Sequence, residues 1–200
     1  MGQSFFTVIL QEFRMIRNLM VAGLVALVGG LAVAAELKSG PQSGEKLPGP
    51  FHPLNVNGDK AGEKQCLYCK FGDSPVAMVF ARTPECPMTQ KLIKAIDAAA
   101  AKNAKSEMGA YVVFLTDDDK AADKLKAFAE KENLKNVILA VDNPSGPNKY
   151  NVSKDADLTV VLYSERTAKA NMAFEKGKIT DKDITAVEAG ITSLTAPVKK

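Results

Sequence analysis

The pattern of apolar and polar positions divides the chain between Leu54 and Leu194 into strands and helices. Val76–Ala81 is an apolar run with β-branched residues, which is typical of a strand buried on both faces. Apolar residues at helical spacing follow it, from Met88 to Ala100. Further strands are predicted at Tyr111–Thr116, Val137–Val141 and Leu158–Tyr163, and Asn171–Phe174 is predicted to be the hairpin partner of the last of these. Further helices are predicted at Ala122–Ala129 and Ile184–Leu194. This order predicts an α/β fold in which helices flank a mixed central sheet.

A cysteine stands where the strand Val76–Ala81 gives way to the following helix. The chain turns through Thr83-Pro84-Glu85-Cys86, and Pro87 suits a first helical position because its fixed φ matches a helix start. Cys86 is therefore predicted at or near the N-cap. The unpaired N–H groups and the positive end of the helix dipole favour a thiolate there, which is the reactive form. A free thiol with only a packing role is the alternative.

The N-terminus carries an uncharged apolar segment, residues 19–35, which follows Arg14 and Arg17. Small residues at Ala32-Val33-Ala34 suit a signal peptidase, so residues 1–34 are predicted to be a cleaved signal peptide. The alternative is a retained membrane anchor formed by residues 19–35, at the short end of the spanning range. We therefore expect an exported protein, periplasmic or extracellular, which contacts a membrane only if the segment is retained.

Residues 35–53 are rich in Gly, Pro, Ser and Lys and are predicted to form a flexible linker. A domain spanning residues 54–194 follows, and residues 195–200 form a basic tail. The formal charge is +3, and loss of residues 1–34, with two arginines and one glutamate, leaves +2. Such a balanced surface argues against nucleic acid as a partner. His52 is the only histidine, so a histidine-assisted triad or a His-rich metal site is not expected.

Two more cysteines form the motif Cys66-Leu67-Tyr68-Cys69. This spacing permits a local disulfide, a redox pair or half of a zinc site, but two further zinc ligands are not found close by. Lys70 stands where a covalent haem motif requires histidine, so neither a metal nor another cofactor is expected. In an exported protein the default is an oxidised pair, either structural or catalytic.

The strand before Cys86 spans roughly 20 Å from Val76 to Arg82. Cys69 precedes this strand and Cys86 follows it, whereas the Cα atoms of bridged cysteines lie within about 7 Å. The motif Cys66–Cys69 and the thiol of Cys86 are therefore predicted to be separate features.

This order of elements, with Cys86 at the start of the helix after the first core strand, resembles the thioredoxin-like superfamily. The strand NVILAVD and the loop PSGPNKYNV after it resemble the redoxin and peroxiredoxin branch (alkyl hydroperoxide reductase/thiol-specific antioxidant-like). The resemblance implies a thiol/disulfide oxidoreductase or peroxidase that acts through Cys86 on protein thiols and disulfides or a small peroxide. Thr83 matches the threonine three residues before a peroxidatic cysteine, and Arg82 is a candidate for the activating arginine.

The chain also departs from the family pattern. Thr89 replaces the second cysteine of thioredoxins, which implies single-thiol chemistry, and Val79 replaces the proline of peroxiredoxins. Neither the activating arginine nor the cis-proline of these families occurs at Ala156-Asp157-Leu158. Two functions therefore remain open. One is an exported oxidoreductase or weak peroxidase, and the other is a non-catalytic envelope protein that binds a partner or has a structural role, with Cys66 and Cys69 as a structural disulfide.

Overall fold

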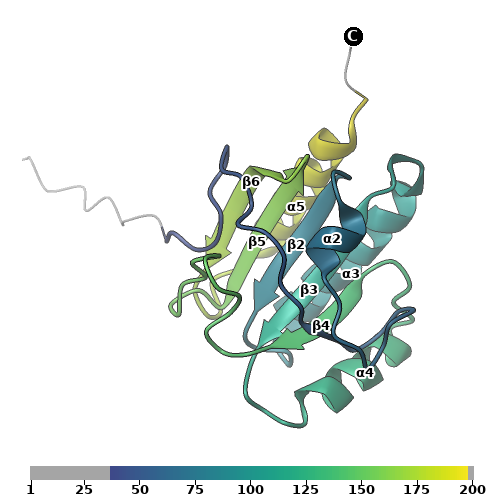
Figure 1. The fold of residues 1–200 in the computed structure, drawn as a ribbon, viewed down its shortest axis with the longest axis vertical. Helices are drawn as coiled ribbons and strands as arrows, with labels where there is room; N and C mark the ends of the chain where they lie inside the picture. The colour runs from purple at the N-terminus through teal and green to yellow at the C-terminus, as the bar shows by residue number, and fades with distance from the viewer. Residues whose placement is uncertain (1–36, 198–200) are drawn as a thin grey trace, which may run out of the picture. The chain divides into compact units, whose positions relative to one another are not determined.

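A computed structural model describes residues 37–197, and the predicted signal peptide or anchor lies outside this range (Figure 1). The elements are β1 (Leu54–Asn55), α2 (Leu67–Phe71), β2 (Val76–Ala81), α3 (Pro87–Lys102), the 3-10 helix η1 (Ala104–Ser106), β3 (Gly109–Leu115), α4 (Ala121–Lys131), β4 (Ile138–Asp142), β5 (Leu158–Ser164), β6 (Thr167–Phe174) and α5 (Asp181–Thr195). Among the described residues, no helix is long and apolar enough to cross a membrane.

The strands form one mixed sheet in the order β1-β4-β3-β2-β5-β6. β2 is parallel to β3, and β3 is parallel to β4, whereas the other neighbouring pairs are antiparallel. Every residue of β2 is buried, as expected for a strand with a neighbour on each side and a covered surface on each face. The structure confirms the predicted α/β fold with a mixed sheet flanked by helices.

The two faces of the sheet have different covers. Alternate residues of β2 point to opposite faces. Ala77, Val79 and Ala81 join the core formed with α3, α4 and α5, whereas Val76, Met78 and Phe80 face the aromatic core on the other side. α2 and the chain before β1 cover this second face (Figure 1). The Cys66–Cys69 motif therefore lies in the layer opposite the long helices.

Residues 37–53 are not the flexible linker that their composition predicts. Leu47 and Phe51 are buried in the aromatic core. The backbone N–H of Gly44 donates to the carbonyl of Ala168 (2.8 Å), and that of Leu47 donates to the carbonyl of Arg166 (2.8 Å). Two apolar side chains in a Gly- and Pro-rich segment are enough to attach it to β6, so the compact unit begins at Leu37 and not at Leu54.

Candidate functional site

Cys86 lies at the junction of β2 and α3, as predicted. It is the N-cap residue of α3 with an extended backbone, and Pro87 follows in the first turn. Its thiol is free and partly exposed, and its side chain makes no capping hydrogen bond. The backbone N–H of Cys86 donates to the carbonyl of Thr83 (3.3 Å), which closes the turn between strand and helix. The residue is therefore partly accessible, and its side chain does not cap the helix.

The start of this turn is bound to the start of β5. The hydroxyl of Thr83 donates to a carboxylate oxygen of Asp157 (2.6 Å), and the backbone N–H of Arg82 donates to the carbonyl of Asp157 (3.0 Å). Asp157 is buried, with 7% of its surface exposed. A hydrogen bond to a carboxylate in such a position is stronger than one between neutral groups. The hydrogen bond from Thr83 to Asp157 thus helps to fix the position of the turn that ends at Cys86.

The side chain of Arg82 contacts three backbone carbonyls. Its guanidinium donates to Pro144 (2.8 Å), Ala156 (3.0 Å) and Ser153 (3.1 Å). Within residues 37–197, no hydrogen bond joins it to Cys86. The arginine fork therefore connects the loop after β4 and the chain before β5 to the end of β2.

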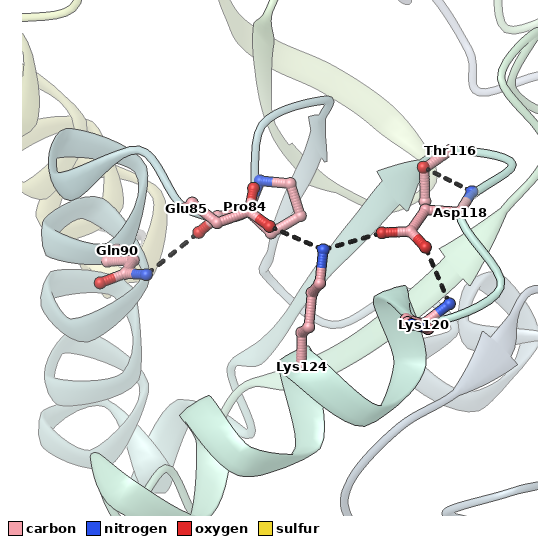
Figure 2. A network of polar contacts seen from close by, with 7 residues as sticks. All are labelled: Pro84, Glu85, Gln90, Thr116, Asp118, Lys120 and Lys124. Carbon is pink, nitrogen blue, oxygen red and sulfur yellow. Dashed lines mark hydrogen bonds and ion pairs between the residues drawn. The ribbon is translucent and has the colours of Figure 1, made fainter.

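On its exposed side, the turn is connected to α4 by ion pairs (Figure 2). The ammonium of Lys124 lies 3.2 Å from a carboxylate oxygen of Glu85 and 2.9 Å from one of Asp118. The hydrogen bond from Lys124 lowers the pKa of Asp118, and the backbone N–H of Lys120 adds to this effect. Because these groups are exposed, they orient the turn more than they stabilise the fold.

Cys66 and Cys69 form a disulfide with a Cα–Cα distance of 5.2 Å, and Cys86 is free, which confirms that the cysteines form two separate features. Cys66 is the N-cap residue of α2, and the backbone N–H of Cys69 donates to its sulfur (3.1 Å). α2 precedes β2, whereas Cys86 follows it. Within residues 37–197, no three histidine, cysteine or acidic side chains lie close enough to hold a metal ion.

No protein-family model and no curated protein matches the sequence. Solved structures do match. A proposed thiol:disulfide interchange protein DsbE from Chlorobium tepidum is 18% identical with a TM-score of 0.56, and the match covers 80% of this chain and all of that one. Peroxidoxin BcpB from Mycobacterium tuberculosis is 13% identical with a TM-score of 0.59, covering 80% of this chain and 99% of that one.

A third match is the exposed lipoprotein thioredoxin Etrx1 from Streptococcus pneumoniae, which is 17% identical with a TM-score of 0.51 over 72% of this chain and 99% of that one. The fold is thioredoxin-like. The predicted resemblance to the thioredoxin-like superfamily and its peroxiredoxin branch is confirmed at the level of fold. At these identities the likeness establishes the architecture, and the chemistry has to be argued from the residues themselves.

Two positions distinguish this thioredoxin-like fold from the family pattern. Thr89, in the place of a second cysteine, is 1% exposed, and its hydroxyl makes no hydrogen bond with any described residue. Asp157 stands where the family has its cis-proline region, and both its backbone groups are paired, the N–H with Phe174 and the carbonyl with Arg82. Cys86 therefore has no second thiol in its helix, and Asp157 offers no free backbone group for a substrate strand.

Proposed function

We propose that this protein exchanges thiols and disulfides through a single cysteine, Cys86. The observation that carries the proposal is the position of that cysteine, which is a free, partly exposed thiol at the N-cap of the helix that follows the central strand. The thiol/disulfide proteins among the structural neighbours are consistent with this chemistry.

In the proposed reaction, the thiolate of Cys86 attacks one sulfur of a substrate disulfide. A mixed disulfide with Cys86 forms, and the second substrate sulfur leaves as a thiolate. Thr89 cannot resolve this intermediate, since it has no sulfur. A first external thiol must therefore attack the sulfur of Cys86 in the mixed disulfide and release the remaining substrate sulfur as a thiolate. A second external thiol then attacks the first one, displaces Cys86 as a thiolate and joins the first in a disulfide. Two electrons pass in total from the two external thiols to one substrate disulfide.

Disulfide exchange is favoured over peroxide reduction because the two nearby donors are already occupied. The hydroxyl of Thr83 donates to Asp157, and the guanidinium of Arg82 donates to three carbonyls. A peroxide would need such donors for the oxygen that leaves during attack by the thiolate. We assign Thr83 and Arg82 the role of positioning the turn that carries Cys86. Peroxide reduction is the second candidate function, supported by the peroxidoxin among the neighbours.

The test uses the full chain, purified in detergent because residues 19–35 are apolar. Reduction of insulin and consumption of peroxide are measured for the wild type, Cys86→Ser and Cys66→Ser/Cys69→Ser. We expect insulin reduction that is lost in Cys86→Ser and persists in the double variant, with little peroxide turnover. Insulin reduction that survives undiminished in Cys86→Ser would contradict the assignment of the exchange to Cys86, and absence of insulin reduction in the wild type would favour a non-catalytic role in partner binding.

A second measurement tests the single-thiol step itself. Treatment of the Cys66→Ser/Cys69→Ser variant with 5,5′-dithiobis(2-nitrobenzoate) should release one nitrothiobenzoate per chain and leave a stable adduct on Cys86. Only an added thiol should remove the adduct. Spontaneous loss of the adduct would show that another group of the protein resolves it, which the proposal excludes.

We also propose that the protein is exported, on the basis of the basic and apolar N-terminus and of an exposed lipoprotein among the structural neighbours. Cell fractionation followed by N-terminal sequencing tests this. A mature chain that begins near Ala35 or Glu36 indicates a cleaved signal, and an intact N-terminus in the membrane fraction indicates an anchor. Recovery of the intact chain in the cytosol would contradict export.

A further inference from the structure

The two cysteines of the Cys66–Cys69 disulfide differ in exposure. Cys66 is buried, with 9% of its surface exposed, whereas Cys69 is exposed. Disulfide exchange requires an incoming thiolate to approach one sulfur directly, so the accessible sulfur is the one attacked. We therefore expect an external thiol to attack the sulfur of Cys69 and not that of Cys66.

The environment of Cys66 suits a leaving thiolate. The backbone N–H of Cys69 donates to the sulfur of Cys66 (3.1 Å). A hydrogen bond to sulfur favours its charged form, and a better-stabilised leaving thiolate departs faster. Exposure and hydrogen bonding thus favour the same direction of disulfide exchange, in which the incoming thiolate attacks Cys69 and Cys66 leaves.

Contacts other than the disulfide also hold α2 in place. Leu67 of α2 is fully buried in the aromatic core, and the ring of Phe71 stacks on that of Tyr111 with centroids 5.9 Å apart. The backbone N–H of Lys70 donates to the carbonyl of Cys66 (2.9 Å). None of these contacts uses the bond between the sulfurs, so the pair can open while the helix stays packed.

We propose that Cys66–Cys69 is a second thiol/disulfide exchange site, independent of Cys86, whose reaction partner is a dithiol. A thiolate of the dithiol attacks the sulfur of Cys69, a mixed disulfide forms, and Cys66 leaves as a thiolate. The second thiol of the partner then attacks the mixed disulfide and releases Cys69. The partner ends as a disulfide, and two electrons and two protons pass to the pair. In the reverse reaction, the reduced pair reduces a partner disulfide to a dithiol, and the bond between Cys66 and Cys69 forms again.

This inference goes beyond the proposed function, because it places a second redox site at the end of β2 opposite to Cys86. Its experiments use the Cys86→Ser full chain, so a negative result does not bear on the proposed exchange at Cys86. A negative result in the experiments on Cys86 likewise does not bear on this second site. Dithiothreitol serves as the small dithiol, and thioredoxin, kept reduced by its reductase, serves as the protein dithiol.

In the first experiment, the Cys86→Ser chain is equilibrated with graded ratios of reduced and oxidised dithiothreitol, quenched with acid, alkylated and mapped by mass spectrometry. We expect reversible reduction without denaturant, with an unchanged circular dichroism spectrum. Reduction only in unfolding concentrations of urea would overturn the proposal and identify a structural clasp. Reduction by thioredoxin as well would identify a protein dithiol as the partner class, and reduction by dithiothreitol alone a small one.

The second experiment tests the direction of attack. Cys66→Ser/Cys86→Ser leaves only Cys69, and Cys69→Ser/Cys86→Ser leaves only Cys66, so the two are matched controls. In the folded state, 5,5′-dithiobis(2-nitrobenzoate) should modify Cys69 at least about tenfold faster than Cys66, and the difference should vanish in urea. Equal rates in the folded state, or a faster Cys66, would overturn the assignment of Cys69 as the attacked sulfur.

Discussion

The hydroxyl of Thr83 donates a 2.6 Å hydrogen bond to the carboxylate of Asp157, a residue 74 positions later in the chain. This bond connects the turn that ends at Cys86 with the start of β5. Because Asp157 is buried, loss of its donor leaves a carboxylate that water cannot fully solvate. The position of the proposed nucleophile therefore depends on a pair of residues that flank two different strands, Thr83 after β2 and Asp157 before β5.

Thr83→Val should lower the free energy of unfolding by about 1–3 kcal/mol, since it leaves the buried carboxylate without its hydroxyl partner. Thr83→Ser, which keeps the hydroxyl, is the matched control and should retain most of the stability. Urea unfolding measures both variants. The rate of exchange at Cys86 should fall in the valine variant alone. Equal stability of the two variants would contradict a role for the hydrogen bond.

Thr89 and Thr159 make a matched pair with opposite expected effects. Both are buried, but the hydroxyl of Thr89 has no partner among the described residues, whereas that of Thr159 lies 2.6 Å from the hydroxyl of Ser39. Burial of an unpaired hydroxyl costs about 1–3 kcal/mol.

Thr89→Val should therefore raise the free energy of unfolding by about 1 kcal/mol, because valine has nearly the same shape and removes the unpaired group. Thr159→Val should lower it by a similar amount, because it breaks a buried hydrogen bond. Chemical unfolding of both variants distinguishes the two cases. A loss of stability in Thr89→Val would show that its hydroxyl is in fact bonded, for instance to an ordered water molecule.

The sequence predicts the central part of this site but not its surroundings. The apolar run of β2 and the proline after Cys86 are local signals, and each fixes a strand or a helix start without reference to the rest of the chain. The bond between Thr83 and Asp157 joins distant positions, and such a pairing has no local signature. α2, with five residues, is too short to show a helical period.

The packing of the segment before β1 is likewise not predictable from local sequence. Its Gly and Pro content predicts a mobile linker, yet Leu47 and Phe51 are buried. Two isolated apolar residues have no periodicity, so only the aromatic face of the sheet, which they cover, shows why they pack. Ser39 adds a polar contact to Thr159 that depends on this packing. Tertiary burial, which local composition cannot show, therefore decides the structure of this segment.

The buried tyrosines predict a loss of stability at high pH. Burial raises the pKa of Tyr163 to about 12 and also raises the pKa of Tyr111 and Tyr150 above the usual value of 10.0. In the unfolded chain these groups lose their protons near pH 10, whereas the folded state holds them. The stabilisation is therefore fully present below pH 10 and is lost as the pH rises to about 12.

Urea unfolding at increasing pH, with tyrosinate absorbance recorded in parallel, measures this loss. Each unit of raised pKa corresponds to about 1.4 kcal/mol. Tyr163→Phe removes one ionisable hydroxyl, which lies 3.5 Å from that of Tyr111, and its stability should fall less steeply above pH 10 than that of the wild type. An unchanged pH dependence would contradict a contribution from Tyr163.

A substitution at Gly109 perturbs the packing of α2 without changing a cysteine. A Cβ atom at this position would overlap the ring of Phe71, which holds α2 on the sheet by stacking on Tyr111. Gly109→Ala should therefore displace the ring and lower the free energy of unfolding by about 1–3 kcal/mol. Gly190→Ala is the control. The Cβ atom of an alanine at position 190 would lie 2.6 Å from the terminal methyl group of Leu162, the far end of its side chain. Alanine is also about 1 kcal/mol more favourable than glycine inside a helix.

The same substitution tests the asymmetry of the disulfide. If Phe71 keeps Cys66 buried by holding α2, then displacement of the ring should expose that sulfur. In the Cys69→Ser/Cys86→Ser chain, addition of Gly109→Ala should speed the reaction of Cys66 with 5,5′-dithiobis(2-nitrobenzoate), whereas addition of Gly190→Ala should not. If Gly109→Ala destabilises the chain yet leaves the rate at Cys66 unchanged, the protection of Cys66 does not come from the packing of Phe71 on the sheet.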